Sequence, residues 1–411
     1  MHWFVATPRS WDSTYGWTGP DGGRAIRADD FAALDFNGGD LTVTSAADAA
    51  VRGLFLRNLG PGTTTLLVKK SAFEVCGHTT ESDIVHVGAG GRLEAVDATV
   101  TVKDRGNDNC GISNVSPLDL DGGELLFRGT SRLVNYGLPS PEYAGTGNLN
   151  GRFRFGTGTT VFEDDAVFTT DYAKGGKQQN VFYHHIEPKR AGETAKVVFH
   201  GRSRPSFPSM PWNLIMGGNG GGNAILEFDT DFDGTINNLW NQAYVGTTSG
   251  HAEILIRRGH LSFGTYDIFH IASCGSDSSS GSTSQLAITG RVEIASGASL
   301  LVYGRQPLTT SFGGMGVGQG VALRQARGRS LLHGELAIAG AYRQEYGNFL
   351  VGLGPCADGE VVQTDGTAHV VDGAYAETEP IGEVAIAAFG GTGRYELRGG
   401  LFSTKRTVYV G

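Results

Sequence analysis

Short apolar runs alternate with polar turn residues along the whole chain. The runs are rich in Val, Ile, Leu, Phe and Thr, whereas Gly, Asn, Asp, Ser and Thr separate them. These separating residues favour turns, because glycine accepts positive φ and the polar side chains bond to nearby backbone. No stretch carries the i, i+3, i+4, i+7 spacing of an amphipathic helix. The pattern predicts an all-β protein with strands at residues 41–43, 65–68, 84–87, 100–102, 124–127, 152–155, 196–199, 225–228, 253–256, 285–289, 300–302 and 360–363.

Several segments resemble one another at a fixed offset. The segment starting at Gly359 aligns with the one starting at Gly393, in the frame G-x-β-x-x-x-x-G and at an offset of 34. Residues 87–93 align with residues 120–125 at an offset near 32, and a looser copy follows Gly320. Pairs of an apolar residue and glycine recur at Met315-Gly316, Val351-Gly352 and Val410-Gly411.

Such offsets match the length of one long coil of a solenoid. A single coil cannot bury its inward face, but stacked coils share a continuous apolar column. We therefore predict a right-handed parallel β-helix (β-solenoid) with an aromatic-rich N-terminal cap and irregular central loops. A multidomain β-sandwich and a β-propeller are the alternatives, although the chain lacks propeller signature motifs and its spacing is irregular.

The two ends differ from the centre. Residues 1–35 are predicted to be a capping segment and residues 36–411 the solenoid, with a loop-rich centre at 100–250 and the most regular Gly-rich repeats at 310–411. A sugar-stacking platform is the alternative to a cap for the aromatic residues of the first segment, which are Trp3, Phe4, Trp11, Tyr15 and Trp17.

Composition narrows the possible partners. The net charge of −9 argues against nucleic acid and anionic membranes, which require clustered Lys and Arg. No apolar run reaches the length of about 18 residues that a transmembrane helix needs, and the first residues lack the segments of a signal peptide. The four cysteines form no C-x-x-C pair. Cys76 and Cys110 could form a disulfide. The alternative is that the cysteines are buried as small apolar residues.

Glycine-rich strand repeats of autotransporter-associated β-strand proteins resemble three segments of this chain: Phe349-Leu-Val-Gly352, Gln363-Thr-Asp-Gly366 and Phe389-Gly-Gly-Thr-Gly-Arg-Tyr-Glu-Leu-Arg-Gly-Gly-Leu401. Their entry segment is similar to Asp29-Asp-Phe-Ala-Ala-Leu-Asp-Phe36 with Leu41-Thr-Val43. The resemblance covers residues 25–75 and 310–411. It implies a bacterial protein that is secreted or on the cell surface, and it carries over no functional residue. The chain stops in mid-repeat, so we expect a fragment, a partner or self-association through the solenoid ends.

The densest group of titratable side chains lies at 183–190. His185 could abstract a proton next to a uronate carboxylate, with Lys189 or Arg190 neutralising the developing charge. Neighbouring histidines on a strand point to opposite faces, so His184 and His185 are not expected to bind one metal ion. A solvated loop is the plainer interpretation.

Acidic residues alternate over 229–233. Asp229, Asp231 and Asp233, followed by Gly234, resemble the first part of a calcium loop, but Trp240 occupies the position of its closing Glu. A strand with an outward acidic row explains the same alternation. Calcium is the only cofactor that the sequence indicates.

Two functions are compatible with these features. The first is a secreted or cell-surface scaffold, adhesin or matrix-type protein without catalysis. The alternative is a carbohydrate-active β-helix enzyme, a polysaccharide lyase or glycosidase that uses the central loops, with Trp212 as a residue that could stack on a sugar ring. Polysaccharides or other surface proteins are the expected partners.

Overall fold

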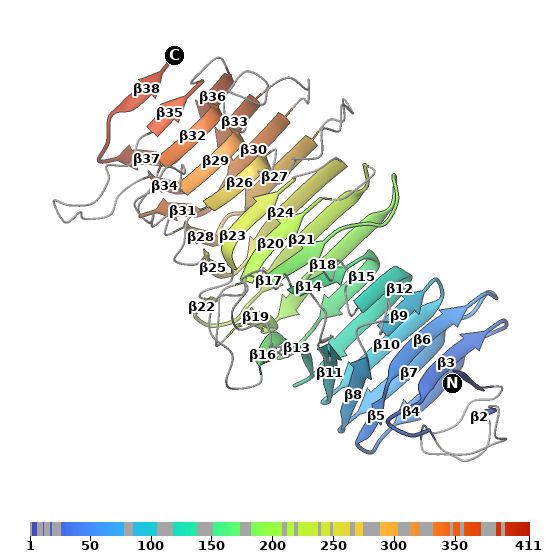
Figure 1. Cartoon of the computed structure of the whole chain (residues 1–411). Coiled ribbons are helices and arrows are strands. Elements are labelled where there is room, and N and C mark those ends of the chain that lie inside the picture. Colours follow the sequence, from blue (N-terminus) through green and yellow to red (C-terminus); the bar gives the residue numbers. More distant parts are fainter. Residues whose placement is uncertain are drawn as a thin grey trace, which may run out of the picture. The chain divides into compact units, whose positions relative to one another are not determined.

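The chain forms two compact units of β-strands in a computed structural model (Figure 1). Unit 1 comprises Met1–His185 and Lys196–Met210, and unit 2 comprises Ile186–Ala195 and Pro211–Gly411. The residues that the structure describes contain no helix, and hence no helix long and apolar enough to cross a membrane. They are residues 2–5, 11, 17–18, 26–77, 85–104, 118–137, 151–172, 182–207, 212–217, 221–236, 240–246, 250–263, 268–273, 288–302, 314–319, 332–345, 348–353, 357–370, 384–387 and 391–411.

Unit 1 is built of coils with up to three strands, and strands at the same position of successive coils pair in parallel. The first position holds β3 (Phe31–Phe36), β6 (Gly53–Asn58), β9 (Val85–Gly88) and the start of β12 (Leu118–Arg128). The second holds β4 (Leu41–Ser45), β7 (Thr64–Lys69), β10 (Gly91–Val96), the end of β12 and β15 (Thr157–Phe162). The third holds β5 (Ala49–Val51), β8 (Ala72–Gly77), β11 (Thr99–Asp104), β13 (Arg132–Gly137), β16 (Val167–Tyr172) and β19 (Arg204–Ser206).

Unit 2 repeats this arrangement in three parallel sheets. One contains β21 (Asn223–Thr230), β24 (Gly250–Arg258), β27 (Ile288–Ile294), β30 (Leu332–Ile338), β33 (Ala357–Gln363) and β36 (Thr392–Leu397). The next contains β22 (Thr235–Ile236), β25 (His260–Phe263), β28 (Ser299–Val302), β31 (Ala341–Gln344), β34 (Thr367–Val370) and β37 (Leu401–Thr404). The last contains β20 (Trp212–Met216), β23 (Trp240–Val245), β26 (Ile268–Ser273), β29 (Gly314–Gln319), β32 (Asn348–Leu353), β35 (Val384–Ile386) and β38 (Val408–Val410).

Three further strands belong to the coils: β14 (Gly151–Phe155) in unit 1, and β17 (Phe182–Ile186) and β18 (Thr194–Gly201), in which the division between the units falls. The parallel pairing confirms the predicted parallel solenoid. It excludes the β-sandwich and the propeller, whose sheets are antiparallel.

Alternation along each strand separates the core from the surface. In β10, Leu93 and Ala95 are buried, whereas Arg92 and Glu94 point outward. Inward residues of successive coils then stack on each other, because the strands are in register. The rings of Phe127, Phe162 and Phe199 form such a column in unit 1, with centroids 5.1 and 4.9 Å apart and planes nearly parallel. These columns are the hydrophobic core of the coils.

The corners after the second strands of unit 1 share one backbone conformation. A residue with positive φ occupies the corners that follow β7, β10, β12 and β15 and the end of β18; these residues are Lys70, Asp97, Gly129, Asp164 and Gly201, with φ between 50 and 62°. Such a conformation is easy for glycine and strained for Lys. The corners align because the same turn must be repeated at each coil for the strands to stay in register.

Both offsets found in the sequence are confirmed as coil lengths. Gly359 pairs with Gly393, and Leu93 pairs with Leu125. One repeat assignment was wrong: Met315 pairs with Phe349 rather than with Val351, so the pair Met315-Gly316 is two residues out of frame. The sequence alignment was misled there because many strands of this chain contain an apolar residue followed by glycine.

The predicted loop-rich centre at 100–250 contains strands as well as insertions. Among these strands are β17, β19, β20, β22 and β23. They form because the polar insertions separate apolar runs that can still pair with the neighbouring coils.

The N-terminal segment lies against the first coil. β1 (His2–Val5) pairs in parallel with β3 and antiparallel with β2 (Trp17–Thr18). Trp11 is buried, and its ring meets that of Phe73 edge-on at 4.9 Å. These contacts support a cap at this end. Because β3 starts at Phe31, the strands of the solenoid begin inside the predicted capping segment.

Candidate functional site

Both histidines of the predicted acid–base segment are buried. His184 and His185 lie in strand β17, with exposed fractions of 1% and 4%, so the interpretation of this segment as a solvated loop was wrong at these positions. The ring of His184 packs among Phe153, Phe168 and Phe207. Burial, and then the neighbouring His185, hold the pKa of His184 well below its usual value. His184 is therefore a neutral part of the core.

The cationic residues of that segment follow β17 in the chain. Lys189 is half-buried and Arg190 is exposed. Arg190 bonds twice to Glu193, through its backbone N–H at 3.0 Å and through Nη1 at 2.7 Å. His185 belongs to unit 1, whereas Lys189 and Arg190 belong to unit 2. His185 is buried and Arg190 is bonded to Glu193. The proton abstraction next to a uronate carboxylate therefore stays a prediction.

The acidic alternation at 229–233 begins in a strand, as the non-metal interpretation predicts. β21 ends at Thr230, so Asp229 lies in the strand, and Asp231 and Asp233 are exposed in the turn after it. The carboxylate of Asp229 pairs with Arg258. The hydrogen bond with Asp229, followed by the charges of Asp229 and Asp231, raises the pKa of Arg258. The guanidinium of Arg258 thus neutralises the charge of Asp229, one of the three carboxylates that were predicted to bind calcium.

No group of three or more His, Cys, Asp or Glu side chains in the described ranges is arranged to hold a metal ion. Cys76 is buried and its thiol donates to Glu74 at 2.5 Å. The other three cysteines lie outside the described residues. Trp212 starts β20 and its backbone pairs with Trp240, but its side chain is outside the described part, so its role in sugar stacking stays a prediction.

Outward side chains of the larger sheets form ion pairs between coils. In unit 2, Arg291 bonds to Glu335 of the next coil at 3.2 Å, and also to Glu293 of its own strand at 2.8 Å. In unit 1, Arg128 lies between Glu94 and a second glutamate, Glu163, at 3.2 and 3.0 Å. The pairs arise because parallel, in-register strands place residues of successive coils side by side. Charges on these parts of the outer faces are therefore paired with charges of the neighbouring coils.

One cluster on the outer face of unit 1 differs from these exposed pairs. Asp119 of β12 is 7% exposed, and its carboxylate accepts a hydrogen bond of 2.7 Å from Nδ1 of His86 in β9. The imidazole is stacked on the ring of Phe55 in β6, with centroids 4.6 Å apart and planes 10° apart. Register places these three residues on consecutive strands. A buried carboxylate is costly unless it is paired, so the His86 contact is needed where it lies.

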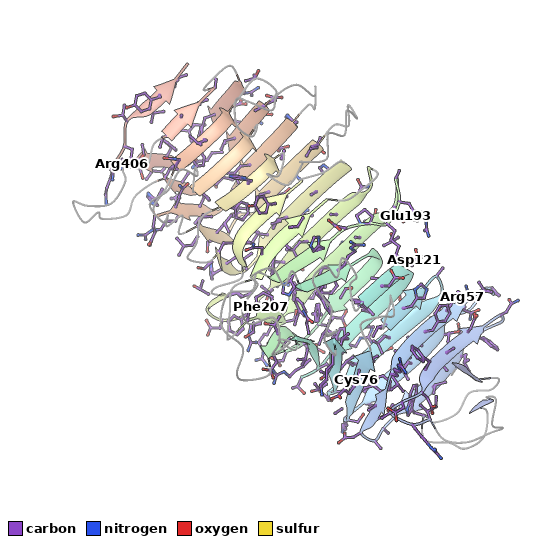
Figure 2. All side chains as sticks on the ribbon, in the orientation of Figure 1. Arg57, Cys76, Asp121, Glu193, Phe207 and Arg406 are labelled. Atoms are coloured by element: carbon purple, nitrogen blue, oxygen red, sulfur yellow. The ribbon has the colours of Figure 1, made fainter. Side chains whose placement is uncertain are left out.

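A second row of the same face borders this cluster. Arg57 donates from Nε and Nη2 to Asp35, at 3.1 and 2.6 Å, and its guanidinium lies 5.1 Å from the centre of the Phe55 ring. The next residue of the row is Gly88, which is paired with Asp121 of β12. In the view of Figure 2, Arg57 and Asp121 lie along the same side of unit 1. Gly88 itself is buried, and the His86 ring and the stem of Arg57 lie nearest to its missing side chain.

The sequence contained a signal for this cluster that we did not use. Residues Val85–Gly88 and 118–121 both alternate apolar and polar positions, and they overlap the starts of the two segments that align at an offset near 32. Extending that alignment towards the N-terminus brings His86 opposite Asp119 once the irregular register at Asp121 and Gly122 is allowed for. That irregularity cannot be read from composition or alternation.

Comparison with protein-family models, with curated proteins and with solved structures finds no match for this chain.

Proposed function

We propose that this protein is a secreted or cell-surface β-solenoid scaffold of the adhesin or matrix type, which acts without catalysis. The observation that carries the proposal is the set of outer sheet faces, on which in-register strands pair charged side chains of successive coils. Such a face is rigid and repetitive, which suits extended contact with a polymer or another surface protein. The resemblance to autotransporter-associated repeats supports export and a surface location.

The placement of the residues predicted to be catalytic also favours a scaffold over an enzyme. A general base must reach the proton that it abstracts, but His185 is 4% exposed. The cation assigned to stabilise charge, Arg190, is bonded to Glu193. The carbohydrate-active enzyme is therefore the second candidate, and it is an outcome of the test below.

Localisation and activity test the proposal together. Antibodies against the chain should label intact source cells or their medium, and external protease should remove the signal while a cytoplasmic control protein survives. The purified chain should release neither unsaturated uronate products nor reducing ends from glycans. Labelling only after lysis would overturn the surface location, and glycan cleavage by the pure chain would favour the enzyme.

A further inference from the structure

Strand β36, in the last coil of unit 2, has a backbone edge that no described strand covers (Figure 1). It pairs in parallel with β33, and the backbone N–H of Arg398, just after the strand, donates to the carbonyl of Gln363 at 2.8 Å. Successive residues of a strand direct their backbone groups to opposite edges. Arg394 and Glu396 therefore direct theirs towards β33, as Arg398 does. The N–H and C=O groups of the residues that alternate with them face the open edge.

The charged side chains of β36 form a pattern that is complementary to itself. Arg394 and Glu396 lie on the outer face, one on each side of Tyr395, and they form an ion pair within the chain. A second copy of β36, antiparallel and with Tyr395 opposite Tyr395, brings Arg394 of each copy opposite Glu396 of the other. A two-fold axis at Tyr395 therefore sets opposite charges across from each other.

The two neighbouring registers are less favourable. With the axis at Glu396, like charges face each other, which is destabilising. With the axis at Leu397, opposite charges meet, but the contact extends to Gly400, which lies beyond the end of β36 and has φ of 80°. The axis at Tyr395 combines opposite charges with residues that all belong to the strand.

The backbone favours the same arrangement. With the axis at Tyr395, its N–H and C=O groups meet those of the second Tyr395, and Gly393 of each copy meets Leu397 of the other. Each of these pairs exchanges two hydrogen bonds, because these residues face the open edge. Arg394 and Glu396 then occupy the non-hydrogen-bonded positions, where facing residues of antiparallel strands approach most closely.

Apolar side chains at the end of the coil add to this edge. Leu397 continues the inward column of Ile338 and Gln363, which are 1% and 0% exposed, but it is itself 52% exposed. The two-fold axis at Tyr395 turns the last coil of the second copy over, so that its β38 lies against β37 and the inward side chains of both coils meet. Removal of this apolar surface from water stabilises the contact.

The strands at the other end of the chain do not favour a head-to-tail contact, which joins two different edges. Among the described residues there, β1 is paired on both sides, with β3 and with β2. β2 has only two residues, and the backbone N–H of Trp11 donates to the carbonyl of Thr44 in β4. A two-fold contact uses the same edge of both copies, so β36 alone is sufficient.

We propose that two copies of this protein form a dimer in which β36 pairs antiparallel with β36 of the second copy, about a two-fold axis at Tyr395. Arg394 and Glu396 determine the register of this pairing. The inference goes beyond the proposed scaffold function and does not depend on it, because the contact forms whether or not the protein is exported. For a scaffold, dimerisation doubles the number of outer faces that contact a polymer.

Charge reversal in the 411-residue chain tests the register. Arg394→Glu or Glu396→Arg alone sets two pairs of like charge across the axis, whereas the double variant restores two opposite pairs. Arg343→Glu and Glu345→Arg are the matched controls: Arg343 of β31 bonds to Glu345, two residues on, at 3.4 Å, and β31 lies two coils before β37. Circular dichroism establishes that each variant is folded.

Sedimentation equilibrium measures the dissociation constant of the dimer. We expect dimers of the original chain and of the controls, a loss of affinity of about tenfold in each single variant, and recovery in the double variant. Hydrogen exchange at the amide of Tyr395 should slow as the dimer forms. A monomer at all concentrations, which would leave this edge to another partner, overturns the proposal. Masses beyond a dimer, or a double variant as weak as the single ones, also overturn it.

Discussion

Buried polar side chains follow two different physical solutions in this protein. Tyr342 is fully buried and its hydroxyl donates to Gln344 at 2.9 Å, while the amide of Gln344 donates to the carbonyl of Asn348. His270 has no such bond from either ring nitrogen within the described part of the chain. Its ring meets Tyr244 edge-on at 5.7 Å. The first solution satisfies hydrogen bonds, and the second keeps the group uncharged.

His270 should make the protein sensitive to acid. Burial lowers its pKa from 6.5 to about 3. The unfolded chain therefore takes up a proton that the folded chain refuses, and stability present above pH 6.5 is lost as pH falls towards 3. In His270→Phe we expect this loss between pH 6.5 and 3 to shrink by a few kcal/mol, since one pKa unit corresponds to about 1.4 kcal/mol.

Denaturant unfolding at several pH values measures the effect. His333→Phe is the control, because His333 is exposed and the acid-induced loss should stay as in the original chain. An equal pH dependence in His270→Phe and the original chain would contradict the role of His270.

At the scale of the element, the corners of the coils impose a backbone conformation that not every residue tolerates. Lys70 has φ of 50°, and its backbone N–H bonds to the carbonyl of Val96 in the next coil at 3.0 Å. At Gly366, by contrast, an added side chain would come 1.9 Å from the carbonyl oxygen of Gly340. Only glycine fits this second corner, whereas the first holds a Lys at a cost in strain.

Lys70→Gly should stabilise unit 1. Left-handed backbone costs a residue with a side chain about 1–2 kcal/mol, and glycine loses about 0.5–1 kcal/mol in chain entropy. We therefore expect a net gain of roughly 0.5–1 kcal/mol in denaturant unfolding. Lys69→Gly is the control: Lys69 is an exposed strand residue without positive φ, so the sign should reverse. Destabilisation by Lys70→Gly would show that the corner is not strained.

At the scale of the molecule, the last coil leaves apolar residues uncovered. Val384 is 1% exposed, but Val408, which pairs with it one coil later, is 38% exposed. Tyr409 and Val410 are 56% and 75% exposed. Uncovered strand edges with apolar side chains favour pairing with other strands.

We therefore expect the 411-residue chain to self-associate through its last coil. Light scattering after size exclusion should show a mass that rises with concentration, and the double variant Tyr409→Lys with Val410→Lys should stay monomeric because charge disfavours edge pairing. Leu59→Lys is the control, since Leu59 is 63% exposed in unit 1. A monomer at all concentrations, or equal association in the double variant, would refute this expectation.

The sequence by itself determined that the chain forms short strands with alternating buried and outward positions, because alternation is a local property of each strand. It also identified the two coil lengths at which glycines and leucines repeat in register. It did not identify the partners across coils where the insertions vary. His251 pairs with Thr289, 38 residues on, and Ile288 with Leu332, 44 residues on.

Contacts between coils depend on those unequal lengths, so only the tertiary structure decided them. The burial of His185, the pairing of Asp229 with Arg258 and the cluster around His86 all belong to this class. The physical reason is that a residue's face follows from its neighbours in the chain, whereas its partner follows from the path of the chain around a whole coil.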